Sequence, residues 1–136
     1  MKKALAMMLV LVLAFMAGGC SDPEEVAEKD IVDKVYAYEK DGCGSTFTIE
    51  IKADGTYTYY EGFLSSHIGM GQWSYSDGML ILSEKVSRFD KTFSKMEEVI
   101  YSYHFSVARD ALIFVDKDSG NFRYVKVKDG ERFFAQ

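Results

Sequence analysis

The sequence predicts an all-β domain, an antiparallel meander of about eight strands that closes into a small barrel. Three observations carry this prediction: apolar and polar residues alternate with period two, Asp-Gly pairs recur, and one hairpin pattern is repeated. Closure is expected because it removes exposed strand edges, which otherwise invite aggregation.

Period-two alternation begins near residue 35. Phe47, Ile49 and Ile51 point to one side of an extended chain, whereas Thr48 and Glu50 point to the other. Such alternation is typical of a strand with one buried face.

Asp-Gly pairs separate several of these runs. Glycine accepts the positive φ that tight hairpin turns require, so the pair between two alternating runs predicts a hairpin. The pairs are Asp41-Gly42, Asp54-Gly55, Asp77-Gly78 and Asp129-Gly130.

A weak internal repeat supports the meander. Residues 73–82 and 105–114 share one pattern of three strand residues, a three-residue turn and four apolar residues, 32 positions apart. The expected strands cover 34–40, 46–52, 56–61, 71–76, 79–83, 98–108, 111–115 and 122–128.

One segment departs from this pattern. Val86, Phe89, Phe93, Met96 and Ile100 recur every three or four residues, which is helical spacing. We therefore predict a short helix over 86–97 across a barrel end, with a long irregular hairpin loop as the alternative.

The first nineteen residues have the layout of a secretory signal. Lys2 and Lys3 precede an apolar run of thirteen residues, Ala4 to Met16, and small residues follow. The run is too short to span a bilayer, which needs roughly 20 residues. Residues 1–19 are therefore expected to be a signal peptide.

The stretch Phe15-Met16-Ala17-Gly18-Gly19-Cys20 resembles the lipobox of bacterial lipoproteins, although that family usually has Leu where Ala17 stands. The resemblance implies that Cys20 carries a diacylglycerol and becomes the mature N-terminus, which anchors the chain at the extracytoplasmic face of the cell membrane. Ordinary signal cleavage at the same bond is the alternative.

Residues 20–33 are acidic and hold the single proline, Pro23, so we expect a lipidated tether ahead of a barrel domain over 34–136. Asp22 is a candidate cap for a short helix within this tether. With Cys20 acylated, Cys43 has no partner in the chain and is expected to be buried; without the lipid, a Cys20–Cys43 disulfide becomes possible.

Charge and motif content exclude several classes of function. Without the signal, 14 basic residues stand against 21 acidic ones, a net charge of −7, which argues against nucleic acid as a partner. His67 and His104 lack partners at metal-ligand spacing, and no nucleophile elbow, phosphate loop or dinucleotide motif occurs. We expect no metal, no cofactor and no enzymatic activity.

The candidate binding region is the longer loop within residues 59–73, which interrupts the tight turns with hydroxyls, an imidazole and a carboxylate. Loops on rigid scaffolds often carry binding functions. A corner loop eased by Gly69 and Gly71 is the plainer alternative. The candidate contact residues are Tyr60, Glu61, Ser65, Ser66, His67 and Trp73.

The runs 47–57, 65–73, 77–82 and 124–130 are similar to a lipocalin-like β-domain, found in uncharacterised Gram-positive lipoproteins and appended to membrane metallopeptidases of the β-lactam-sensor type. The resemblance implies a barrel and carries over no catalytic residue. A module that binds a small ligand, a peptide or an envelope component is the expected function. A protein-interaction role, such as inhibition of a lysozyme or protease, is the alternative.

Overall fold

The computed structural model describes residues 25–38, 47–62 and 65–136. The signal peptide, Cys20, Asp22, the Asp41-Gly42 turn and Cys43 lie outside these residues. In the part of the chain that is described, no helix is long and apolar enough to cross a membrane.

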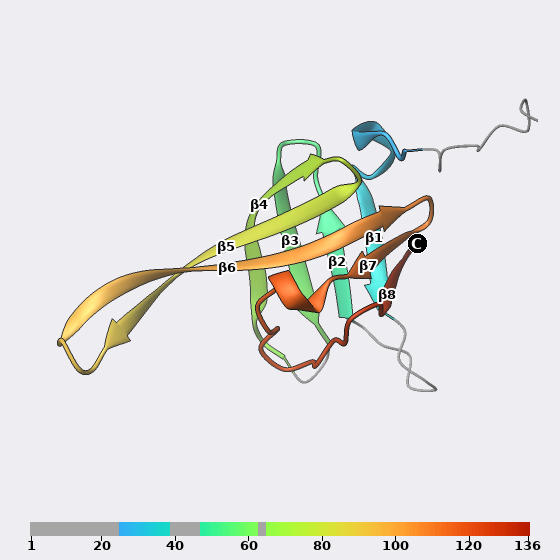
Figure 1. Ribbon diagram of the computed structural model, residues 1–136. Helices are drawn as coiled ribbons and strands as arrows, with labels where there is room; N and C mark the ends of the chain where they lie inside the picture. The colour runs from blue at the N-terminus through green and yellow to red at the C-terminus, as the bar shows by residue number, and fades with distance from the viewer. Residues whose placement is uncertain (1–24, 39–46, 63–64) are drawn as a thin grey trace, which may run out of the picture.

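Eight antiparallel strands form a closed barrel in simple up-and-down order (Figure 1). Each strand pairs with the next along the chain, and the last pairs with the first. The predicted all-β, lipocalin-like barrel is therefore confirmed. The strands are β1 (Lys34–Tyr38), β2 (Phe47–Ile51), β3 (Thr56–Glu61), β4 (Ile68–Ser76), β5 (Met79–Asp90), β6 (Lys95–Ala108), β7 (Ala111–Phe114) and β8 (Arg132–Ala135), with short 3-10 helices η1 (Glu28–Asp30) and η2 (Asp116–Asp118).

The Asp-Gly pairs form turns as predicted wherever they are described. Asp77 and Gly78 have φ values of +50° and +73° and form a two-residue loop between Ser76 and Met79, which face each other across β4 and β5. Positive φ at both loop positions is the geometry that matches the twist of a tight hairpin.

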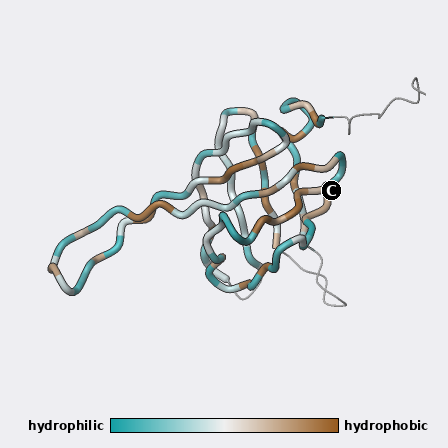
Figure 2. Tube along the Cα trace, viewed as in Figure 1, coloured by the Kyte–Doolittle hydropathy of each residue, from teal (hydrophilic) through white to brown (hydrophobic). Residues whose placement is uncertain are grey.

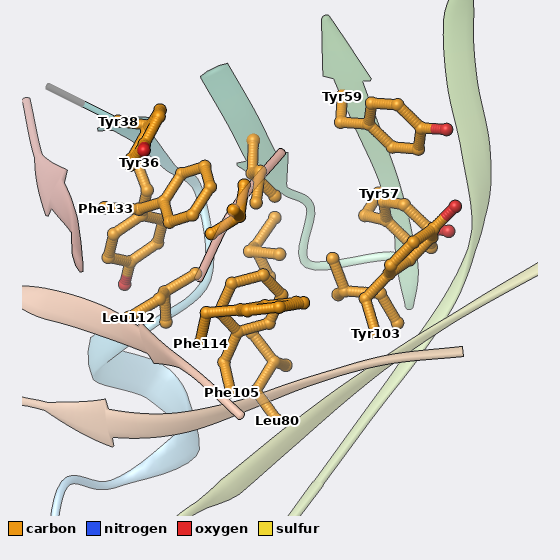
Figure 3. Packing of buried hydrophobic residues seen from close by; sticks show 14 of the residues in the cluster. Tyr36, Tyr38, Tyr57, Tyr59, Leu80, Tyr103, Phe105, Leu112, Phe114 and Phe133 are labelled. Atoms are coloured by element: carbon orange, nitrogen blue, oxygen red, sulfur yellow. The ribbon is translucent and has the colours of Figure 1, made fainter. Parts of the chain in front are cut away.

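Aromatic side chains fill the barrel interior. Phe47 packs edge-on against Phe133 and Phe122, with ring centroids 5.0 and 4.9 Å apart. An eight-stranded barrel is just wide enough for its own side chains, so these rings occupy the centre themselves (Figure 3). The buried aromatic residues are Tyr36, Tyr38, Phe47, Tyr57, Tyr59, Tyr103, Phe105, Phe114, Phe122 and Phe133.

The strand predicted over 122–128 is wrong, because the last strand is β8. Residues 119–128 instead cross one end of the barrel in an irregular course. Phe122 and Val127, each 7% exposed, point into the core from this segment. The Phe122 ring stacks on Tyr103 at a centroid distance of 4.2 Å and so plugs the end of the barrel.

The predicted helix over 86–97 is also wrong. Strands β5 and β6 stay paired from Met79↔Ser106 to Asp90↔Lys95, whereas β4 and β5 pair only as far as Gln72↔Ser83. The expected strand limits at 83 and 98 therefore fall inside longer strands. Residues 84–101 form a two-stranded arm that projects from the barrel (Figure 1).

Cross-strand contacts stabilise the arm. Phe89 lies directly opposite Met96, and an Arg88–Glu97 ion pair spans the two strands. At the tip, the Asp90 carboxylate accepts the backbone N–H of Thr92 at 2.8 Å. The exposed apolar side chains of the outer arm are Phe89, Phe93 and Met96, whereas most of its other residues are hydrophilic (Figure 2).

Residues before β1 pack against the barrel end opposite the arm. Ile31 is 1% exposed and belongs to the core, and the Tyr75 hydroxyl donates to the Val26 carbonyl. This segment, the end of β6 and the β6–β7 turn line a cavity of about 520 Å³, whereas the arm leaves from the other end of β6.

We predict that Phe122→Ala lowers the free energy of unfolding by about 3–5 kcal/mol, because it leaves a cavity among four aromatic rings. Urea denaturation measures this change. Phe93→Ala at the arm tip, where the side chain is 69% exposed, serves as the control and should stay within about 0.5 kcal/mol of the unchanged protein. Equal effects of the two substitutions would contradict the plug.

Candidate binding site

A pocket of about 320 Å³ lies where the arm leaves the barrel. One wall is the inward face of the arm, which continues the interior face of β5 and β6. The opposite wall is the barrel rim, from β3, the β3–β4 loop and the segment after η2. The lining residues are Tyr59, His67, Glu84, Val86, Arg88, Tyr101, Tyr103, Asn121 and Arg123.

A row of polar contacts crosses the pocket. The Glu84 carboxylate, on a residue only 6% exposed, accepts the Tyr59 hydroxyl at 3.2 Å and lies 3.7 Å from His67 Nε2. Arg123 Nη1 lies 3.4 Å from His67 Nδ1. Because arginine can only donate, this contact is a hydrogen bond in the tautomer whose Nδ1 carries no proton. The row thus runs from an acid to an exposed guanidinium.

Glu61 holds the segment that carries Arg123. Its carboxylate accepts the backbone N–H groups of Arg123, Tyr124 and Val125 at 3.2, 2.8 and 2.8 Å. Three charge-assisted hydrogen bonds compensate for burial of the acid, which is 6% exposed. They also explain why these residues do not form a strand, since their donors turn toward a side chain.

The hydroxyls of Tyr57, Tyr59 and Tyr103 point to the same side of the barrel interior (Figure 3). Burial raises the pKa of Tyr57, Tyr59 and Tyr103, that of Tyr103 to about 12, and the nearby Glu84 carboxylate also raises each pKa. The phenols are therefore uncharged hydrogen-bonding groups at neutral pH.

Tyr57 supplies unused hydrogen-bonding capacity in this region. Among the described side chains, its hydroxyl is the one buried polar atom that has no hydrogen-bond partner. Such atoms are rare in folded proteins because an unpaired buried hydroxyl is costly. The neighbouring Tyr59 ring needs Gly69, where an added Cβ would lie 1.9 Å from it.

Of the residues proposed from the sequence, Glu61, Ser65 and His67 lie at this site. His67 lines the pocket, and Glu61 lies behind it. Ser65 is buried, and its Oγ accepts the His67 backbone N–H at 3.1 Å, so it shapes the loop. Ser66 is exposed beside them.

Tyr60 and Trp73 lie elsewhere. Tyr60 alternates with the inward-facing Tyr59 and Glu61, so it faces the outside of β3. Trp73 sits toward the other end of β4, where its Nε1 donates to the Lys52 carbonyl at 2.8 Å.

The sequence interpretation missed the residues that β5, β6 and the segment after η2 contribute. One signal was present: Leu80, Leu82 and Glu84 alternate on the inward face of β5, so a carboxylate continues an apolar row. Arg123 and Asn121 carried no comparable signal, because their placement depends on the Glu61 contacts 62 or more residues away.

Within the described residues, no three His, Cys, Asp or Glu side chains are grouped closely enough to hold a metal ion. Comparison with protein families, curated proteins and solved structures finds no match for this chain. The structure itself defines the class of the protein: a closed eight-stranded antiparallel barrel with a projecting arm and a polar pocket at the base of the arm.

We predict that Glu61→Gln destabilises the fold by about 2 kcal/mol, because an amide oxygen replaces a charged acceptor of three N–H groups. Amide hydrogen exchange at residues 123–125 should become faster. Glu50→Gln, on the exposed face of β2, is the matched control with little expected effect. Unchanged exchange at 123–125 would contradict the anchoring role.

Proposed function

We propose that this chain is an exported lipoprotein, anchored to the membrane through Cys20, whose barrel binds a small anionic ligand in the pocket at the base of the arm. The observation that carries the binding proposal is the pocket itself, in which an exposed arginine lies at one end of a polar row backed by uncharged tyrosines.

The pocket favours an anionic group with a neighbouring hydrogen-bond donor. Arg123 offers a positive group at the rim, and guanidinium groups bind carboxylates and phosphates with two parallel hydrogen bonds. Glu84 can accept from a ligand hydroxyl or amine on the inner side. The volume falls at the small end of the range for ligand pockets.

Binding is favoured over catalysis by the chemistry of the lining. The nucleophilic groups among the nine lining residues are His67, Glu84 and three tyrosines. Burial raises the pKa of Tyr59 and Tyr103, and Glu84 and His67 lie against each other. The charged groups are engaged with one another, which suits recognition of a complementary ligand.

A protein-interaction role, including inhibition of a lysozyme or protease, is the second candidate. The arm favours it, because Phe89, Phe93, Met96 and Ile100 are each more than half exposed. Exposed apolar groups gathered on one projecting element mark interaction surfaces more often than scattered ones do.

For the pocket, we predict that a set of small carboxylates and phosphates contains compounds that raise the melting temperature of the protein. Arg123→Gln should weaken their binding about tenfold to a hundredfold in isothermal titration, through loss of a charge-assisted contact. Arg132→Gln, which removes an exposed arginine from β8, is the matched control. Equal affinities for both variants would refute the pocket as the ligand site.

For the anchor, we predict that cells producing the protein incorporate labelled palmitate into it and that Cys20→Ala abolishes the label. The substitution removes the only sulfur that the lipobox resemblance implies is acylated. Cys43→Ala is the control, because that thiol is outside the motif. Retention of label in the Cys20 variant would exclude this anchor.

A further inference from the structure

Strands β4 and β5 separate at the base of the arm and leave two facing edges. Their pairing ends at Gln72↔Ser83, after which residues 68–71 pair only with β3 and residues 84–90 only with β6. At the point of separation the strands are in close contact, since a Cβ on Gly71 would lie 2.0 Å from the Ser83 carbonyl oxygen. We call this opening, between residues 68–71 and 84–90, the fork.

The direction of the backbone groups on β6 can be read from its neighbours. The carbonyls of Ser102 and His104 accept the N–H groups of Gly120 and Val115, at 2.7 and 2.9 Å, on the side away from β5. Peptide groups alternate in direction along a strand. The N–H and C=O groups of residues 97, 99 and 101 therefore point toward β5.

On β5, the residues that leave free peptide groups therefore alternate as well. Residues 84, 86 and 88 lie opposite 101, 99 and 97 and exchange hydrogen bonds with them. The peptide groups of Lys85, Ser87 and Phe89 then point into the fork, where no strand of the described chain pairs with them.

Apolar side chains flank the fork on its outer face. Ile68 and Met70 from β4 are 54% and 61% exposed, and Phe89 from β5 is 56% exposed. On the inner face, Glu84, Val86 and Arg88 of β5 and His67 before β4 line the pocket. The fork thus has a free hydrogen-bonding edge, an apolar outer side and a charged inner side.

We infer that an extended peptide with a free terminal carboxylate binds in the fork as an added strand. Its backbone pairs with residues 85–89, and its carboxylate contacts Arg123 in the pocket. Strand addition to an exposed edge is an established mode of peptide recognition, in which backbone bonds supply affinity and alternate side chains supply specificity. The carboxylate part of this inference rests on the proposed function of the pocket.

Two observations favour a chain end over a hairpin or a second copy. The fork is closed at its base by the contact of Gly71 with Ser83, so a strand that enters it must end there. The Arg123 guanidinium lies on the inner side of that opening, where a terminal carboxylate supplies the complementary charge. Alternate peptide residues should be apolar, because they cover Ile68, Met70 and Phe89.

The test uses a library of fluorescent octapeptides with alternating apolar and polar positions, each made with a free C-terminus and as the C-terminal amide. Binding to the purified full chain is measured by fluorescence anisotropy. Free-acid peptides should bind, and amidation should weaken them at least tenfold. Arg123→Gln should lower the affinity of the free acids to that of the amides.

Two proline variants test the edge. Ser87→Pro removes an N–H that points into the fork, whereas Glu98→Pro, directly opposite, removes one from the other edge of the arm. Ser87→Pro should weaken peptide binding at least tenfold, and Glu98→Pro should leave the Kd within about twofold. Circular dichroism checks that both variants fold.

Equal behaviour of the two proline variants, or no binding by any library member, would overturn strand addition. Self-association that sedimentation equilibrium detects and Ser87→Pro abolishes would also overturn it, by assigning the fork to a second copy. Small carboxylates that bind through Arg123 while no peptide does would overturn the fork and leave the pocket standing. Peptides that bind with dependence on Ser87 but not on the carboxylate would support the strand and refute the pocket.

Discussion

The filled interior of the barrel is the constraint on which the rest of the structure depends. Eight strands enclose a space about as wide as their own inward side chains, and ten buried aromatic residues occupy it. A ligand deep in the barrel would have to displace rings such as Phe47 and Phe105, which are fully buried. The pocket accordingly lies at the rim, where the aromatic packing ends and polar groups begin.

Unequal strand length creates the rim site. Strands β5 and β6, at 12 and 14 residues, outgrow their neighbours, so their inward faces continue past the barrel as one wall of a pocket. The same mismatch frees the edges of the fork. The pocket and the fork thus both result from the separation of β4 from β5 after Ser83.

Local patterns in the sequence were enough to predict the barrel strands but not the segments at the barrel ends. Alternation and Asp-Gly turns depend on neighbours in the chain, so β2, β3 and the β4–β5 hairpin were predictable. The apparent helix over 86–97 arose because Phe89 and Met96, seven positions apart, are partners across a hairpin and also lie two turns apart on a helix. Residues 122–128 alternate like a strand, but the distant Glu61 carboxylate takes up the donors of 123–125.

Glu61 also connects the barrel to the pocket, because it holds the segment that carries Arg123. A buried carboxylate normally opposes folding unless charged or polar partners satisfy it, and here the partners are the backbone of the segment that presents Arg123. The same segment inserts Phe122 between Tyr59 and Tyr103. The Glu61 carboxylate and the Phe122 ring together hold this short stretch, so the backbone of Arg123 is fixed beside the pocket. The pocket wall is thus preorganised by the closure of the barrel itself, so any change that loosens the plug should also displace the segment that presents Arg123.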